Sequence, residues 1–110
     1  MLHEKLICYR KSLRLAEELT TQSRAWLRGY GYLSDQLKRA LASVILNCAE
    51  GNARSGNAER KRFFQIARAS IAEVGACLDL ALAFQLIQSS SHQNWKDQCH
   101  QISKILFRLH

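Results

Sequence analysis

The sequence predicts an all-α protein: an antiparallel up-down-up-down bundle of four helices that associates into an oligomer. Apolar residues recur at three- and four-residue intervals along almost the whole chain, which is the spacing of a helix face. The 110 residues contain no Pro and only 5 Gly, too few turn-forming residues for the many short strands of an all-β fold. Short connections between the apolar segments favour antiparallel packing, and the length suits a single domain spanning residues 1–110.

The first helix is expected at about residues 4–27, before the glycines Gly29 and Gly31. A second helix is expected to begin after Ser34 as its N-cap and to end before Gly51, which would be its left-handed C-cap residue. The residues expected in the core from the first helix are Leu2, Leu6, Tyr9, Leu13, Ala16, Leu19 and Trp26. Those from the second helix are Leu37, Leu41, Val44, Ile45 and Cys48.

The third helix is expected to be the longest, at about residues 58–88, with Asn57 as its N-cap and Glu59 near its positive end. Its expected core residues are Phe63, Ile66, Ala67, Ser70, Ile71, Val74, Cys77, Leu78 and Ala81. The fourth helix is expected to follow Ser91 as its N-cap. Its expected core residues are Trp95, Cys99, Ile102, Leu106 and Leu109.

The third helix is also apolar on the side away from its expected core. At about 100° per residue, this side carries Ala69, Ala72, Ala76, Leu80 and Ala83. A helix that is apolar on nearly all sides is buried on nearly all sides, so the sequence predicts self-association through this side. The alternative is an exposed helix that is rich in Ala because Ala has a high helix propensity. Charged residues interrupt the stretch too often for a membrane span.

The second helix shows a related feature opposite its core residues. Leu46 lies there among polar side chains, which is unusual for a position facing open solvent. Arg39, Asn47 and Glu50 are bond-forming groups within reach of one another along the helix. Ser43, Asn47 and Glu50 could form a satisfied polar motif at a subunit contact. They could equally be ordinary surface residues.

The charge balance indicates an anionic partner, with nucleic acid first. Lys and Arg number 16 against 9 Asp and Glu, a formal net charge of +7. A local excess, opposed only by Glu50 and Glu59, comprises Lys38, Arg39, Arg54, Arg60, Lys61, Arg62 and Arg68. Such residues bind phosphates by Coulomb attraction and counterion release. The alternative is a solvated charged face. No motif for sequence-specific reading is found.

The sequence gives no indication of catalysis, of a bound metal or of a cofactor. No zinc-protease, nucleophile-elbow, phosphate-loop or EF-hand motif is present. Asp97 and His100 have the spacing of half a di-iron site, but such bundles need this pair twice together with further Glu residues. We therefore expect a protein that is not an enzyme.

Four cysteines, Cys8, Cys48, Cys77 and Cys99, are widely spaced and form no CxxC pair. Each falls within a helical apolar pattern, which favours buried, reduced thiols, although an even number leaves disulfides possible. The first residues show no secretory signal, because charges interrupt the apolar stretch. A cytoplasmic protein is expected.

The central block carries a resemblance to a known family. Residues 36–73 follow the pattern (R/K)RA-x-x-S(I/V)-x-x-N-x-AEG and then RF-x-x-IA-x-x-S-x-x-E, with Arg54 in the segment between. This block resembles the bacterial four-helix-bundle family encoded in intervening sequences of large-subunit ribosomal RNA genes. That family also includes the accessory variability protein of diversity-generating retroelements. Cys48 stands where the family prefers Ile, and Ala69 replaces its common Gly.

The resemblance implies a ring-shaped homopentamer of four-helix protomers. For the retroelement members it also implies a basic surface that binds RNA or DNA, and a reverse transcriptase partner. The basic positions that match the family are Lys38, Arg39, Arg54, Arg62 and Arg68. Asn47 and Glu50 match its polar helix-end motif, for which a structural role is implied.

Together these observations favour a non-enzymatic homo-oligomer that binds nucleic acid, RNA first, mainly through phosphates. The resemblance allows a role as an accessory to a reverse transcriptase. The rival interpretation is a protein-interaction scaffold with no nucleic-acid role, whose positive charge serves solubility.

Overall fold

The computed structural model describes residues 2–109, with side chains from residue 3 onward. Within that range the chain forms four helices and no strand: α1 (Leu2–Ser23), α2 (Gly31–Ala53), α3 (Asn57–Ala83) and α4 (Ser89–Leu109). The predicted all-α class with four helices is confirmed. The connections are short, as expected for helices that pack against their neighbours in sequence.

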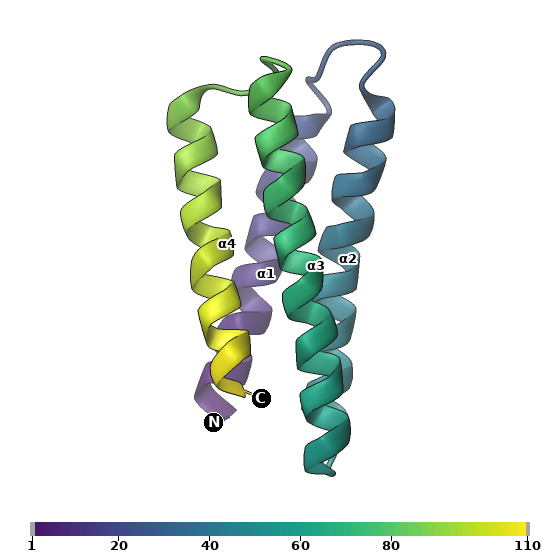
Figure 1. The fold of residues 1–110 in the computed structure, drawn as a ribbon, viewed down its shortest axis with the longest axis vertical. Helices are drawn as coiled ribbons and strands as arrows, with labels where there is room; N and C mark the ends of the chain where they lie inside the picture. Colours follow the sequence, from purple (N-terminus) through teal and green to yellow (C-terminus); the bar gives the residue numbers. More distant parts are fainter. Residues whose placement is uncertain (1, 110) are drawn as a thin grey trace.

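The helices lie side by side in a bundle that is 45 Å long and 23 × 18 Å across. Each helix lies beside two others: α1 and α3 each neighbour α2 and α4. Figure 1 shows the chain reversing direction at each connection, with both termini near the same end. At that end the hairpin of α2 and α3 extends beyond the ends of α1 and α4.

The start of α2 and the end of α3 differ from the prediction. Residue Ser34 lies inside α2, because that helix starts three residues earlier, at Gly31, with Tyr30 in the N-cap position. The third helix stops at Ala83 rather than near residue 88. The backbone N–H of Leu86 donates to the carbonyl of Ala81 (2.8 Å), and Gln85 has a positive φ of 62°. This left-handed turn ends α3 before the serines do.

Gly51 was expected beyond the second helix but lies inside α2 and is buried. A Cβ atom at this position would lie 2.6 Å from Cε1 of Phe64, so α2 and α3 approach too closely here for any side chain. The glycine therefore serves helix packing and not a helix end. Likewise, Asn57 is the first residue of α3 and Gly56 takes the N-cap position, while Ser91 lies within α4.

The core of the bundle confirms the fourth-helix prediction and corrects the first-helix one. All five predicted core residues of α4 are buried. In α1, however, Leu6 and Leu13 are 46% and 37% exposed, and the buried face includes Ser12 together with Cys8 and Leu15. The Ser12 hydroxyl donates to the Cys8 carbonyl (2.8 Å), so a polar residue is satisfied in the core. The spacing of apolar residues alone therefore predicts the wrong buried face for α1, because it does not count a polar residue such as Ser12.

The start of α3 needs a similar correction. Phe64, and not Phe63, is the buried aromatic residue, and Ile66 is 37% exposed. Phe64 occupies the space left by Gly51, so the register of this turn depends on a glycine in the neighbouring helix. From Ala67 onward the predicted core residues of α3 are buried, apart from half-buried Ser70.

All four cysteines are buried and unpaired by disulfides, as expected. The pKa of Cys8 is lowered because the Cys48 thiol hydrogen-bonds to it, and the same contact together with burial raises the pKa of Cys48. Burial raises the pKa of Cys99 to about 11. These thiols therefore act as small apolar core residues.

Candidate nucleic-acid interface and self-association face

The projecting end of the α2–α3 hairpin gathers four of the seven predicted basic residues. We call Arg54, Arg60, Lys61 and Arg62 the basic tip. Residues 52–59 between and beside them are all exposed. Arg54 caps the end of α2 in an extended conformation (φ −83°, ψ 142°), which ends the helix and turns the chain into the short link to α3.

Arg54 is held by carboxylates on both helices. Its Nη2 lies 3.0 Å from Oε2 of Glu50, and its Nη1 lies 3.9 Å from Oε2 of Glu59. Its guanidinium carbon also lies 5.3 Å from the ring centroid of Phe63. These exposed contacts contribute little to stability, but they leave Arg54 partly neutralised.

The other three cations of the basic tip have no carboxylate partner among the described residues. Arg60 donates from Nη2 to Oδ1 of Asn57 (2.6 Å), and the Arg62 guanidinium lies 5.7 Å from the Phe63 ring centroid. Arg60, Lys61 and Arg62 form no ion pair with any residue that the structure describes. With two carboxylates against four cations, the basic tip keeps a positive balance on a surface that water can reach.

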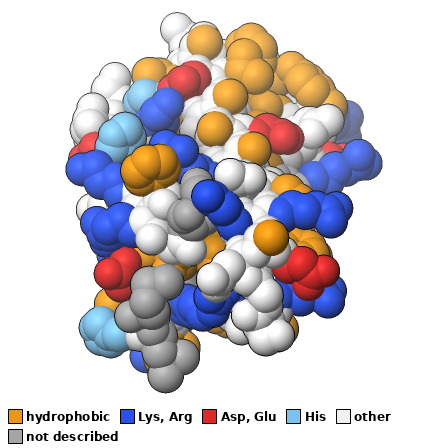
Figure 2. All heavy atoms as spheres, turned by 60° about the horizontal axis from the view of Figure 1, so that its bottom comes forward, with side chains coloured by type: hydrophobic (Ala, Val, Ile, Leu, Met, Phe, Trp, Pro, Cys, Tyr) orange, Lys and Arg blue, Asp and Glu red, His pale blue; other side chains and the backbone are white. Residues whose placement is uncertain are grey.

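The remaining predicted basic residues lie elsewhere. Lys38 and Arg39 are exposed on α2, about 23 Å from Arg54 along the helix. Arg68 lies about 12 Å from Arg60 along α3 and donates from Nε to Oγ of Ser103 on α4 (3.3 Å). Figure 2, in which the end with the projecting hairpin is turned toward the viewer, shows Lys and Arg side chains in several groups with other side chains between them.

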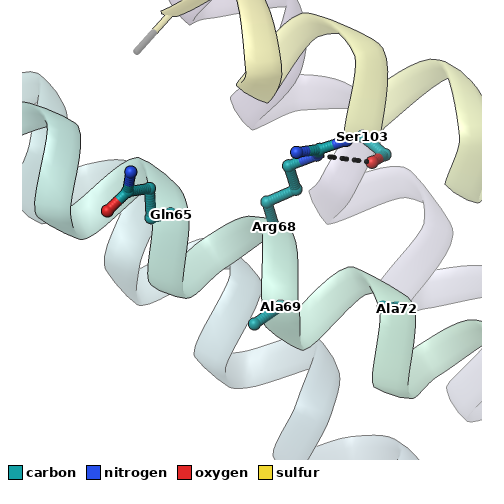
Figure 3. Close-up of a pocket in the computed structure, with 5 residues that line it drawn as sticks. All are labelled: Gln65, Arg68, Ala69, Ala72 and Ser103. Atoms are coloured by element: carbon teal, nitrogen blue, oxygen red, sulfur yellow. Dashed lines mark hydrogen bonds between the residues drawn. The ribbon is translucent and has the colours of Figure 1, made fainter.

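Arg68 lines a groove between α3 and α4 that was not predicted from the sequence. A cavity of about 430 Å³ is lined by Gln65, Arg68, Ala69, Ala72 and Ser103 (Figure 3). An adjoining cavity of about 300 Å³ shares Arg68 and Ser103 and adds residues of α4: His100, Lys104, Phe107 and Arg108. The signal in the sequence was the i, i+4 and i+7 spacing of His100, Lys104 and Phe107, which places them on one helix face.

The predicted self-association residues are all exposed on α2 and α3. Leu46 is 64% exposed and Leu80 is 45% exposed, and the four alanines predicted with them are exposed as well. Ile66 and Phe84, each 37% exposed, extend the same kind of surface. We call this set the apolar face; its residues are Leu46, Ile66, Ala69, Ala72, Ala76, Leu80, Ala83 and Phe84.

The predicted polar motif divides into two parts. Asn47 donates from Nδ2 to the carbonyl (2.8 Å) and to Oγ (3.2 Å) of Ser43. The Ser43 hydroxyl in turn bonds that of Ser70 on α3 (2.6 Å), so this chain of bonds ties the two helices together. Glu50 takes no part in it, because its carboxylate binds Arg54.

No cluster of three or more His, Cys, Asp or Glu side chains that could hold a metal ion occurs among the described residues. Asp97 does not pair with His100. Its Oδ1 instead accepts a hydrogen bond from Nε2 of Gln93 (3.0 Å). His92 and Lys96 instead meet at Asp79, and their hydrogen bonds hold the pKa of this carboxyl below its usual range. In the part of the chain described, no helix is both long and apolar enough to cross a membrane.

The fold and these surfaces define a small four-helix bundle with a basic projecting end and an exposed apolar face. Residues 4–108 match the model of the 23S rRNA-intervening sequence protein family, and the chain belongs to this family. The resemblance found in residues 36–73 is thereby confirmed. A search of curated proteins gave no match.

A solved structure shares the fold. It is a protein of unknown function from the S23 ribosomal protein family of Bacteroides thetaiotaomicron, with 18% sequence identity and a TM-score of 0.87 over 96% of each chain. At this identity the likeness supports the helical architecture and says nothing about binding.

Proposed function

We propose that this protein is a non-enzymatic homo-oligomer that binds nucleic acid, RNA first, through phosphate contacts at the basic tip. The observation that carries the proposal is the placement of four cations on a hairpin end that projects beyond the rest of the bundle (Figure 1). Such a projection can approach a polyanion without a clash from α1 or α4. Arg side chains there offer planar donors suited to phosphate oxygens.

The proposed assembly is a ring, and five copies are the number that the family resemblance implies. The apolar face supports association, since two leucines and an isoleucine exposed on adjoining helices can be buried against a second copy. Exposed alanines allow close approach of a partner helix. In a cyclic ring every basic tip lies at the same height around the axis, so copies of a chain with net charge +7 would strengthen one another's field.

The proposal is tested by replacing Arg60, Lys61 and Arg62 together by Ala. Fluorescence anisotropy with labelled RNA at several salt concentrations should show about tenfold or greater loss of affinity at physiological salt and a shallower salt dependence. The matched control replaces the exposed α1 residues Arg10, Lys11 and Arg14 by Ala, which removes the same charge. An equal loss of RNA affinity in both variants would show that only the net charge matters. Unchanged RNA affinity in the tip variant would reject the basic tip as the binding site.

A second candidate function is a protein-interaction scaffold without a nucleic-acid role. It is favoured by large apolar side chains exposed at the other end of the bundle: Leu27 at 67%, Tyr32 at 58% and Phe84 at 37%. A reverse transcriptase is the protein partner that the family resemblance suggests. Absence of RNA binding by the unmodified protein, even at about 100 μM where non-specific binders are normally detected, would favour the scaffold.

A further inference from the structure

One section of the groove between α3 and α4 combines cationic side chains with an aromatic ring, and it shares no residue with the basic tip. This section is an open depression of about 300 Å³, lined by Arg68, His100, Ser103, Lys104, Phe107 and Arg108. None of the residues of the apolar face lines it. Its size is at the lower end of the range for sites that bind small molecules.

The lining is cationic. The described residues that line it include two Arg, one Lys and one His, and none of these lining residues is acidic. Arg108 is shared with Glu4, whose Oε2 lies 3.3 Å from its Nε. Arg68 donates to a neutral hydroxyl, and Lys104 forms no ion pair with any described residue. Two cations therefore face the section without a carboxylate to neutralise them, which suits a phosphate group.

An aromatic ring stands beside these cations. Phe107 is 58% exposed, although a ring of this size is normally buried, and its centroid lies 4.6 Å from the guanidinium carbon of Arg68. The guanidinium thus lies over the ring, and the two groups form a stacked cation–π pair next to the cationic part of the groove. Surfaces of this kind stack nucleobases, because every base has a π-face.

We propose that this section binds one nucleotide of a single strand, with its phosphate between Arg68 and Lys104 and its base stacked on Phe107. The inference rests on the proposed nucleic-acid function and deepens it, because it adds a site that requires an unpaired base. A duplex keeps its bases in the stack and cannot use Phe107 in this way. The basic tip contributes phosphate contacts, whereas the groove contributes the preference for single strands.

The test compares a labelled twelve-nucleotide oligoadenylate with an abasic strand of the same length by fluorescence anisotropy. Phe107→Ala should weaken binding of the oligoadenylate by about fivefold to about 150-fold and leave binding of the abasic strand unchanged. Phe107→Leu, which preserves most of the apolar volume, should lose the same base-dependent affinity, whereas Phe107→Tyr should retain it. The matched control is Tyr32→Ala, which removes an equally exposed ring at the other end of the bundle, outside the apolar face and the basic tip.

The phosphate contact is tested separately with Lys104→Gln, which should weaken binding of both strands. Its control, Lys11→Gln, removes the same charge from an exposed position on α1. Equal weakening by the two Gln variants, or an effect of Phe107→Leu that is the same for both strands, would overturn the inference. If Phe107 variants bind as the parent does while the triple tip variant is weakened, the groove is rejected and the proposed function stands. If the parent binds neither strand, the proposed function itself fails.

Discussion

Gly51 offers a stringent test of how the projecting hairpin is built. An added Cβ would meet three ring atoms of Phe64, at 2.6, 2.8 and 2.9 Å, where ordinary carbon contacts lie at about 3.5–4.0 Å. Relief needs a shift of about 1 Å, and Phe64 is only 1% exposed, so its ring has nowhere to move. Because the contact is with a fully buried ring, we place the overpacking cost of Gly51→Ala at about 2–3 kcal/mol.

The same substitution has an opposing effect on the helix. Ala in a helix interior is favoured over Gly by about 1 kcal/mol, so the net expected destabilisation of Gly51→Ala is about 1–2 kcal/mol. Gly75 provides the control, because it is also buried in a helix but its added Cβ would come no closer than 3.5 Å, to Nζ of Lys96. Gly75→Ala should therefore stabilise the protein, by about 0.5–1 kcal/mol.

Urea unfolding at a fixed protein concentration measures both free energies, since association would otherwise shift the apparent stability. In a thermal scan the two variants should move the midpoint in opposite directions, each by several degrees for about 1 kcal/mol. A Gly51→Ala variant as stable as the parent would refute the close approach of α2 and α3 at Phe64. A second variant that combines Gly51→Ala with Phe64→Leu should lose less stability than the two single changes together predict.

Two further predictions follow from buried and paired side chains. The four cysteine thiols should react with a thiol reagent only on unfolding, because all are buried; rapid reaction of the native protein would contradict the core described here. Asp79 has a lowered pKa, so its contacts with His92 and Lys96 contribute stability above the unfolded carboxyl pKa of about 3.9, and this contribution is lost as the pH falls through the folded pKa. Asp79→Asn should accordingly lower stability at neutral pH and have little effect in strong acid; the effect should be small, because the carboxylate is half exposed.

Regular patterns in the sequence were sufficient to predict the helical class and most of the core of α4, although they missed buried Ile105. All the apolar residues of α4 with heptad-like spacing are buried, because this spacing places them on the one helix face that packs on the core. The face of α1 could not be predicted in the same way, since Ser12 is buried with its hydroxyl satisfied by the carbonyl of Cys8. The assignment of Phe63 rather than Phe64 to the core failed for another reason. It depends on Gly51, a contact between residues far apart in the chain.

The candidate sites, too, could be predicted only where they do not depend on contacts between residues far apart in the chain. Antiparallel pairing of α2 and α3 was enough to bring Arg54 and residues 60–62 to one end of the hairpin. It could not reveal that Arg54 is partly neutralised by carboxylates from both helices. The groove was missed because Arg68 and Phe107 belong to different helices, and their contact depends on how α3 and α4 pack.

The most direct test of the account is the mass of the native protein at micromolar concentration, measured by light scattering or sedimentation equilibrium. We expect a multiple of the 12.6 kDa chain, about 63 kDa for a ring of five copies. Changing Leu46 and Leu80 to Lys should reduce this mass, because charge would be forced into the contact. A single species of 12.6 kDa for the unmodified protein would contradict self-association through the apolar face.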